Sequence, residues 1–385
     1  MPPKVLLISS NSSARGGGER CLVYLARGLI ELECEVHVLL SNASFMDNWA
    51  DALMKEGAVL YRRHLISLSQ RPFRFIQSIK DWKQIETVSS FCQELGPTAI
   101  LVNQQYDEDG LDYLMGALQS RIAPVGGIMH MPMTTNKNKR PLGRFRGYRL
   151  TKWYEKYPYR LIFVSEGAQK EFETYYPSPR PTYIVNTSVP FQSGKEVSKK
   201  RTIFPIDIPV IGFVGQFVFR KNLDCLINAW LETLKKGVES KLLLVGDGPE
   251  RTHVEHLLQK KAPPGSWHVT GWTAHPEDLF CEMDIFLLVS HFEGLPLSLI
   301  EAAGRAIPSV VVPFNGAKDI AKRASWVKVT SDNSISTISQ TLINTLQNLQ
   351  KLKEIAHIGL NDFRIFFSLR RMASEVLAVL TEERS

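Results

Sequence analysis

Short apolar runs alternate with helical patterns along the whole chain, and this alternation is the strongest constraint on its fold. In the first half, apolar residues such as Cys21, Leu25 and Leu29 follow helical spacing and share one face. Strands that alternate with such helices predict a parallel sheet covered on both faces. The predicted strands of the first half are residues 5–8, 36–40, 59–61, 100–102, 125–129, 161–164 and 183–185.

A second series follows a break near residue 190, where residues 190–201 are polar and basic like a linker. With 385 residues, two domains fit better than one. We expect an N-terminal domain at residues 1–190, a linker at 191–206 and a C-terminal domain at 207–365. Doubly wound sheets bind ligands at the carboxyl ends of their strands, so a cleft is expected there. The predicted strands of the second half are residues 210–214, 242–245, 268–270, 285–289, 310–312 and 326–329.

The composition is that of a folded protein with anionic partners. No apolar run reaches the ~18–20 residues that span a bilayer. Five cysteines without CxxC spacing argue against a disulfide framework or a zinc site, so a reducing cytoplasm is expected. The net charge of +7 favours phosphorylated substrates, nucleic acid or an acidic membrane.

Residues 290–301 carry the strongest chemical signal. An apolar strand ends just before them, a turn follows, and a helix is expected to begin near Leu297. Backbone N–H groups at a helix start bind phosphate, aided by the helix dipole. Glu293 and Glu301 can each hold a diol, such as a sugar ring and a ribose. A structural interpretation also remains, because Ser298 with Glu301 fits a capping box and Glu293 fits a solvated loop acid.

This segment resembles the E-x7-E motif of retaining glycosyltransferases with the GT-B fold, the group 1 family that includes bacterial glycogen synthases and mannosyltransferases. Other short segments resemble further family motifs in the same order. The resemblance implies two Rossmann-like, doubly wound lobes facing a central cleft, with a terminal helix at residues 366–385 that crosses back to the N-terminal lobe. These matching segments are residues 16–20 with 25–26, 164–165, 186–189, 214–222, 245–249 and 367–380.

The resemblance also implies roles for residues of the C-terminal lobe. Glu293 would contact the donor sugar, Glu301 the nucleotide ribose, and the amides of Leu297 and Ser298 the distal phosphate. Lys221 would neutralise the diphosphate as it leaves, where negative charge develops.

This chain departs from the family at Gln216, where an arginine is usual. Arg220 is the candidate to supply the missing charge, although Arg220 and Lys221 also fit a solvated helix start. On the turn after the third strand of this lobe, Trp272 marks the expected base-binding backbone. It fits ordinary core or rim equally well.

In the N-terminal lobe, the resemblance brings Gly16 and Gly17 close to the donor phosphate, since glycine lets a backbone approach a ligand. Neither this loop nor Gly246 with Gly248 has G-x-G-x-x-G spacing, which disfavours a nicotinamide oxidoreductase. His130 follows an apolar strand, where the family has a histidine near the reacting carbon. A lone histidine is also commonly structural.

The segment of residues 137–160 is strongly basic, with nine basic residues and one acid, a net +8. Six aromatic residues are interleaved with them. This combination suits an anionic membrane surface or a lipid-diphosphate acceptor, and we expect no nucleic-acid partner. A solvated face is the alternative. The basic residues are Lys137, Lys139, Arg140, Arg144, Arg146, Arg149, Lys152, Lys156 and Arg160, and a second cluster is Arg62, Arg63, Arg71 and Arg74.

The acidic run Asp107, Glu108 and Asp109 resembles the DxD metal motif of the other glycosyltransferase fold. Because it precedes an expected helix at residues 109–118, where acids favour the dipole, we predict a capping role and no metal.

The resemblance therefore implies a retaining glycosyltransferase, and we expect it to need no metal and no cofactor. It would move a sugar from a nucleotide-diphospho-sugar to a hydroxyl of an acceptor glycan or glycolipid, in cell-surface polysaccharide or glycolipid synthesis. The expected location is the cytoplasm or the inner face of the membrane. A GT-B-like sugar-nucleotide epimerase and a catalytically silent nucleotide-sugar-binding module are the alternatives.

Overall fold

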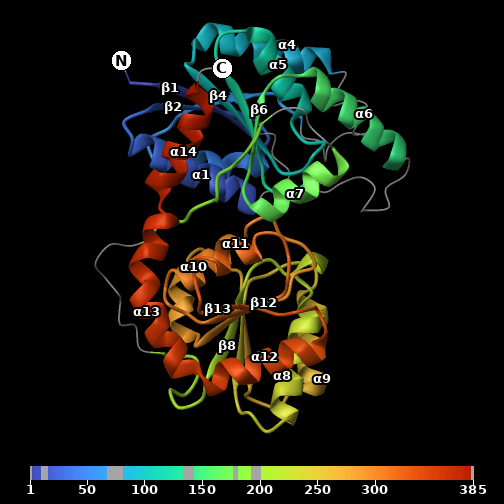
Figure 1. Ribbon diagram of the computed structural model, residues 1–385, viewed down its shortest axis with the longest axis vertical. Coiled ribbons are helices and arrows are strands. Elements are labelled where there is room, and N and C mark those ends of the chain that lie inside the picture. Colours follow the sequence, from blue (N-terminus) through green and yellow to red (C-terminus); the bar gives the residue numbers. More distant parts are fainter. Residues whose placement is uncertain are drawn as a thin grey trace. The chain divides into compact units, whose positions relative to one another are not determined.

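The computed structural model describes residues 2–9, 16–66, 81–132, 143–176, 181–191 and 201–382. The chain divides into two compact units (Figure 1). The N-terminal unit combines residues 1–190 with residues 367–385, and the C-terminal unit is residues 191–366.

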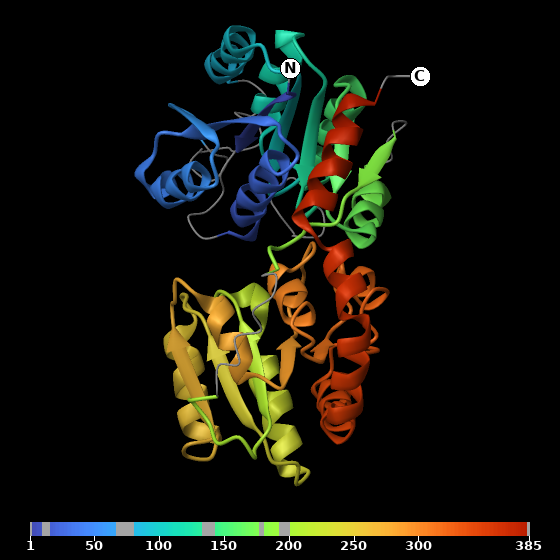
Figure 2. The ribbon, with the colours of Figure 1, turned by 90° about the vertical axis from the view of Figure 1, so that its left-hand side faces the viewer.

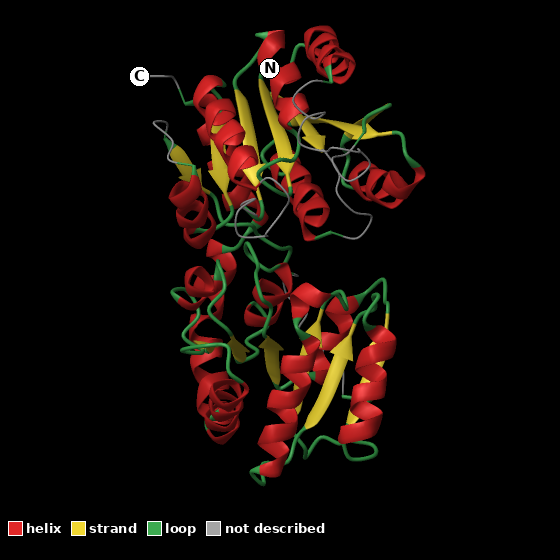
Figure 3. Cartoon of the chain, turned by 90° about the vertical axis from the view of Figure 1, so that its right-hand side faces the viewer, coloured by secondary structure: helices red, strands yellow, loops and turns green. Residues whose placement is uncertain are grey.

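The N-terminal unit is built on a parallel sheet, and the strands of its described residues run in the order β3-β2-β1-β4-β5-β6-β7. Figure 3 shows helices on both faces of this sheet. The strands are β1 (Lys4–Ser9), β2 (Glu35–Ser41), β3 (Val59–Arg63), β4 (Ala99–Gln104), β5 (Val125–Met129), β6 (Arg160–Phe163) and β7 (Thr182–Ile184). The helices are α1 (Gly17–Ile30), η1 (Ser44–Met46), α2 (Asp47–Lys55), α4 (Trp82–Leu95), α5 (Leu111–Ser120), α6 (Gly143–Lys156), α7 (Glu166–Tyr175) and α14 (Leu369–Thr381).

The terminal helix α14 packs on one face of this sheet beside α1 (Figure 2). A side chain at Gly28 of α1 would come within 2.5 Å of the Leu369 carbonyl oxygen, so glycine permits the close approach of the two helices. At Gly126 of β5, a Cβ atom would lie 2.5 Å from Leu380 of α14. Small residues on α1 and β5 therefore make room for α14.

The C-terminal unit repeats this design with a parallel sheet whose described strands follow the order β10-β9-β8-β11-β12-β13. The strands are β8 (Val210–Val214), β9 (Lys241–Val245), β10 (Trp267–Gly271), β11 (Ile285–Leu288), β12 (Ser309–Val311) and β13 (Val327–Val329). The helices are η3 (Phe219–Lys221), α8 (Leu223–Lys235), α9 (Arg251–Lys261), η4 (Pro276–Glu282), α10 (Leu297–Ala303), α11 (Ala317–Ala321), α12 (Ile335–Gln347) and α13 (Leu349–Phe366).

Each predicted strand appears with its ends within two residues of their expected positions, and the predicted α/β class with two Rossmann-like sheets is confirmed. None of the helices in the described part of the chain combines the length and the hydropathy that a bilayer span requires.

Strand order fixes where a ligand can bind in each unit. In the N-terminal sheet the chain grows outward from β1 through β2 and β3, then returns to place β4 on the other side of β1. The C-terminal sheet reverses in the same way between β8 and β11. Because doubly wound sheets bind ligands beside this reversal, at the carboxyl ends of the strands, each unit has one favoured position for a site.

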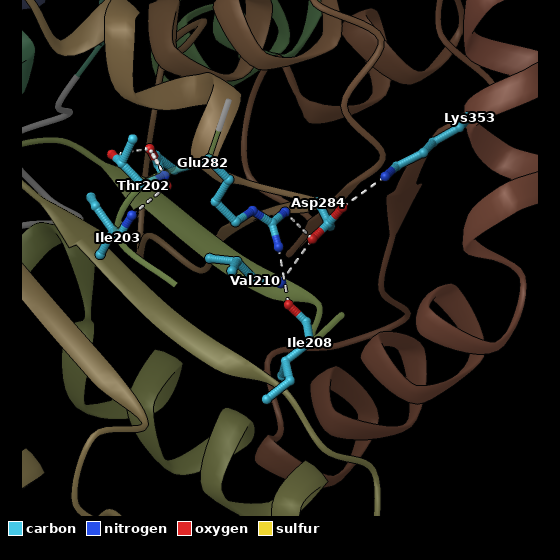
Figure 4. A network of polar contacts seen from close by, with 8 residues as sticks. Thr202, Ile203, Ile208, Val210, Glu282, Asp284 and Lys353 are labelled. Atoms are coloured by element: carbon cyan, nitrogen blue, oxygen red, sulfur yellow. Dashed lines mark hydrogen bonds and ion pairs between the residues drawn. The ribbon is translucent and has the colours of Figure 1, made fainter. Parts of the chain in front are cut away.

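At the opposite end of the C-terminal sheet, a polar network holds the chain that enters this unit (Figure 4). Asp284, just before β11, accepts hydrogen bonds from Arg201, from Lys353 and from the backbone N–H of Val210. Its neighbour Glu282 accepts from the backbone N–H and hydroxyl of Thr202. The network connects the entering segment with β8, with the start of β11 and with α13. It lies at the end of the sheet opposite the candidate ligand position.

We predict that Asp284→Asn lowers the free energy of unfolding by about 3 kcal/mol at neutral pH. The Arg201 side chain is only 9% exposed, and removing one partner of a buried ion pair leaves the other charge uncompensated. Urea denaturation measures the change. Lys353→Met is the matched control and should cost about 1 kcal/mol or less, because the Lys353 side chain is 37% exposed. Equal losses in the two variants would contradict the prediction.

This difference should also depend on pH. Burial raises the pKa of Asp284, but hydrogen bonds from Lys353, Val210 and Arg201 outweigh it and hold the pKa below its usual value. A carboxyl whose pKa is depressed by folding stabilises the protein above its unfolded pKa, and that stabilisation disappears as the pH falls through the folded pKa. Wild type and Asp284→Asn should therefore converge in stability below about pH 4.

Candidate functional site

The candidate site of the C-terminal unit is centred on the carboxylate of Glu293, which follows β11. Lys221 of η3 donates to its Oε1 atom at 2.7 Å, and Arg220 Nη1 lies 2.5 Å from its Oε2 atom. Arg220 also donates to the Phe292 carbonyl at 3.4 Å. The short turn of η3 after β8 points two consecutive cationic side chains at one carboxylate. We call Arg220, Lys221 and Glu293 the ionic triad.

Two members of the triad, Lys221 and Glu293, are buried, and the charges of the triad control its ionisation. The side chains of Lys221 and Glu293 are 9% and 8% exposed, and that of Arg220 is 25% exposed. Burial raises the pKa of Glu293, but the charges of Lys221 and Arg220 overcome this effect and bring it to about 2. Burial lowers the pKa of Lys221, which the charge of Glu293 only partly offsets. Two cations on one anion leave the triad with an excess positive charge.

These contacts settle two alternatives that the residues alone leave open. Arg220 and Lys221 do not form a solvated helix start, because both lie against Glu293. Glu293 is not a solvated loop acid, since it is 6% exposed. Gln216 lies between β8 and η3, half-buried in the same loop.

The second glutamate lies on α10, which begins at Leu297. The N-cap of this helix is Pro296, and no side chain caps it, so the capping-box interpretation of Ser298 and Glu301 is wrong. Leu297 and Ser298 are the first two residues of the helix, and Glu301 is 8% exposed.

Two loops beside the triad pack closely because of glycine. Gly246 has a φ of 143° and lies against the carbonyl of Gly215, leaving no room for a side chain. An added Cβ atom at Gly248 would lie 2.4 Å from the carbonyl oxygen of Phe217. At the end of β10, Trp272 is 59% exposed, so it belongs to the rim of the unit and not to its core.

In the N-terminal unit, His130 follows β5 and is buried beside Asn103, the fifth residue of β4. The His130 Nε2 atom lies 2.6 Å from Asn103 Oδ1, and burial lowers the pKa of His130 to about 4. The N-cap of α1 is Gly16 and its first residue is Gly17, where an added Cβ atom would meet open space. The constrained glycine is Gly18, because a Cβ atom there would press on Gln105 and lie 3.1 Å from the His130 ring.

Asn103 is the functional residue that the sequence interpretation does not single out. Asn103 is a polar residue at the end of an apolar run, which is the same signal that marked His130 after residues 125–129. The same pattern therefore marks Asn103 as a residue at the edge of the sheet.

The acidic run Asp107, Glu108 and Asp109 does not cap the helix that follows it. Helix α5 begins at Leu111 with Gly110 as its N-cap and no side-chain cap, so the capping role is wrong. Instead, Asp107 accepts from the Tyr176 hydroxyl at 2.8 Å, and Glu108 forms a buried ion pair with Arg146. Among the described residues, His, Cys, Asp and Glu side chains do not gather into a group that could hold a metal ion.

The basic segment is only partly a surface. Residues 133–142, with Lys137, Lys139 and Arg140, and the side chain of Arg144 lie outside the described residues, as do Arg71 and Arg74. Trp153, Tyr154 and Tyr159 belong to the hydrophobic core, contrary to the expectation of an interleaved aromatic surface. On the exposed side of α6 lie Phe145, Tyr148, Lys152 and Lys156, with Arg149 half-exposed.

The described side chains of the second basic cluster also contact other parts of the protein, which was not expected of a surface cluster. Arg62 donates to the carbonyls of Ser41 and Ala43 and to Asp47, and Arg63 packs over the Phe91 ring. These contacts give Arg62 and Arg63 structural roles.

Two family models match the chain, one in each unit. The model described as Glycosyltransferase Family 4 matches residues 15–192, and that described as Glycosyl transferases group 1 matches residues 208–348. Curated relatives match over shorter lengths. The amylovoran biosynthesis glycosyltransferase AmsD of Erwinia amylovora is 25% identical over 49% of this chain and 54% of its own length. The lipopolysaccharide core biosynthesis glycosyltransferase LpsE of Rhizobium meliloti is 30% identical over 31% of this chain and 34% of its own length. The chain therefore spans about half or less of the curated relatives that it matches.

Solved structures match along the full fold. The crystal structure of HepE from Anabaena in complex with UDP has a TM-score of 0.79 at 16% identity, covering 99% of this chain and 100% of that one. The apo form of the lipopolysaccharide outer core galactosyltransferase WaaB has a TM-score of 0.70 at 16% identity over the same shares. The two family models together cover both sheets, so the chain belongs to the group 1 glycosyltransferases. The likeness to these solved structures shows the GT-B fold, which has two Rossmann-like domains.

Proposed function

We propose that this protein is a retaining glycosyltransferase. It transfers a sugar from a nucleotide-diphospho-sugar to a hydroxyl of an acceptor glycan or glycolipid, in cell-surface polysaccharide or glycolipid synthesis. The observation that carries the proposal is the ionic triad at the strand reversal between β8 and β11. The names of AmsD and LpsE, and the UDP-glucose complex of HepE, support the substrate class.

The two cations of the triad could stabilise a nucleoside diphosphate as it leaves the donor sugar. As the bond from the anomeric carbon to the diphosphate oxygen breaks, negative charge develops on that oxygen, and preorganised cations stabilise it. Lys221 supplies one cation, and Arg220 supplies the second in place of the arginine that Gln216 replaces. Glu293 accepts hydrogen bonds from hydroxyls of the donor sugar, and Glu301 binds the ribose.

Retention follows from attack on the face from which the diphosphate leaves. The acceptor oxygen bonds to the anomeric carbon, the bond to the diphosphate breaks, and the acceptor proton passes to the departing phosphate oxygen. Two side-chain cations supply the charge that a divalent metal would otherwise carry, so we propose that the enzyme uses neither a metal nor a cofactor. Full activity after treatment with a chelator supports this, and a loss restored by manganese contradicts it.

The first test is ligand binding and turnover. In a thermal-shift screen of sugar nucleotides, with UDP-glucose as the first probe, a ligand that binds only the folded state should raise the melting temperature. Glu293→Gln should remain folded but less stable, because it leaves buried Lys221 without its counter-charge. Per folded molecule it should lose at least about tenfold in transfer, since a hydrogen bond to a charged group contributes roughly 1.5–3 kcal/mol. Glu282→Asp is the control, because Glu282 lies at the opposite end of the sheet.

The products of the same assays separate the alternative functions. An epimerised sugar nucleotide as the product indicates an epimerase, and binding without turnover indicates a silent module.

The second test separates the two cations. We expect Arg220→Ala and Lys221→Ala to lower kcat by about 10²-fold or more, with smaller changes in KM, because the charge matters most in the transition state. Restoring an arginine in the double variant Arg220→Ala/Gln216→Arg should recover part of the lost kcat. A change in KM alone would reduce these residues to docking contacts, and no recovery would contradict the exchange of roles.

The third element of the proposal is attachment to the inner face of an anionic membrane. The exposed side of α6 presents Phe145 and Tyr148 with three basic residues, Arg149, Lys152 and Lys156. Basic side chains near an anionic bilayer contribute on the order of 1 kcal/mol each, and aromatic rings favour the interface. Arg146 takes no part, because it is buried against Glu108.

We predict that Arg149→Glu/Lys152→Glu/Lys156→Glu abolishes co-sedimentation with anionic vesicles and spares UDP-glucose binding. Binding by the wild type should weaken between 0.1 and 1 M salt, where the Debye length falls from ~10 to ~3 Å. The matched control, Lys235→Glu/Lys236→Glu/Lys260→Glu, makes the same change in net charge at exposed positions of the other unit. Equal loss in the control, or no binding by the wild type at low salt, would rule out this surface.

A further inference from the structure

Two side chains and a backbone carbonyl meet where β4, β5 and α1 come together in the N-terminal unit. The Asn103 side chain lies between the ring of His130, at 2.6 Å from Nε2, and the carbonyl oxygen of Gly18, at 3.4 Å from its amide nitrogen. Asn103 and His130 are 4% and 8% exposed, so these contacts form away from bulk water. Buried hydrogen bonds contribute more to stability than the same bonds on a surface, because a buried polar atom that loses its partner cannot bind water instead.

The Gly18 carbonyl fixes the orientation of the Asn103 amide. A carbonyl oxygen can only accept, so the amide nitrogen must face Gly18 and Oδ1 must face His130. The opposite orientation would place two acceptors against each other. Since Oδ1 also only accepts, the His130 Nε2 atom must carry a proton and donate.

The other ring nitrogen is therefore defined as well. A neutral imidazole with a proton on Nε2 carries a lone pair on Nδ1. Within the described part of the chain, no side chain or backbone group forms a hydrogen bond with Nδ1 of His130. Among these described groups, Nδ1 thus remains an acceptor without a hydrogen-bond partner at the carboxyl end of β5.

Two features keep this ring uncharged. Burial lowers the pKa of His130 to about 4. The ring also packs on the first turn of α1, where an added Cβ atom of Gly18 would lie 3.1 Å from it. The partial positive charge of a helix N-terminus disfavours an imidazolium at that position.

We propose that Asn103 is a positioning residue that holds His130 in the Nε2–H tautomer, so that Nδ1 is presented as an acceptor for a sugar hydroxyl. The role toward a sugar rests on the proposed glycosyl transfer. The tautomer itself does not, and it can be tested without any substrate.

The direct test is ¹⁵N NMR of the full chain with labelled histidine, using His130→Gln to assign the His130 signals among nine histidines. The wild type should show a protonated Nε2 and an unprotonated Nδ1 at neutral pH. A proton on Nδ1, or a mixture of the tautomers, overturns the proposal. This measurement needs no variant of Asn103, so it stands even where such a variant folds poorly.

Two variants of similar size test whether Asn103 is the cause. Asn103→Asp keeps an acceptor facing Nε2 and should keep the proton on Nε2, although it loses the donor to the Gly18 carbonyl. Asn103→Leu removes the acceptor and should mix the tautomers. In transfer assays Asn103→Leu should lower kcat by about tenfold or more, as expected for one lost hydrogen bond, with UDP binding unchanged. Circular dichroism and UDP binding report whether each variant is folded.

The outcomes separate the two proposals. If Asn103→Leu keeps both the tautomer and kcat, the positioning role is overturned. If the wild type shows the expected tautomer but transfers sugar from no sugar nucleotide, the sugar-hydroxyl role and the proposed function fail together, while the tautomer assignment stands.

Discussion

The candidate site depends on the parallel pairing of β8 with β11, which brings together groups that are distant in the chain. Lys221 and Glu293 are 72 residues apart, yet their charged atoms lie 2.7 Å apart, because each follows one of the two strands at the reversal of the sheet. Neither charge could be buried alone at this depth without a large cost in solvation. The fold and the triad therefore support each other. The sheet positions the charges, and the pairing makes their burial tolerable.

The strands could be predicted from the sequence because buried parallel strands are continuous apolar runs, and these runs are separated by turns and amphipathic helices. The glutamate pair could be located for a related reason, since a polar residue that ends such a run must lie at the edge of the sheet. The direction of Arg220 could not be predicted. Adjacent residues point apart in most backbones, and only the short turn of η3 aims Arg220 and Lys221 at the same carboxylate.

The basic segment shows where counting charges fails. Leu150, Trp153, Tyr154 and Tyr157 follow helical spacing, and this spacing, more than their mixture with lysine and arginine, decides that they face the core. Arg146 is four residues before Leu150 and therefore lies on the same face, where it requires a buried partner. Glu108 provides that partner, so one acid of an apparent metal motif and one base of an apparent membrane surface neutralise each other.

Burial disfavours the charged form at both polar centres, but the two groups end in opposite ionisation states because their neighbouring charges differ. At Glu293, two cations outweigh the loss of solvation, so the carboxylate stays ionised, with a pKa near 2. At His130, burial is the cause of the pKa shift and the partner of Nε2 is the neutral amide of Asn103, so the ring is uncharged at neutral pH. A charged leaving group needs the first environment, because its negative charge must be matched. Sugar hydroxyls need the second, because a neutral acceptor of fixed orientation can distinguish the position of a hydroxyl without attracting phosphate or other anions in its place.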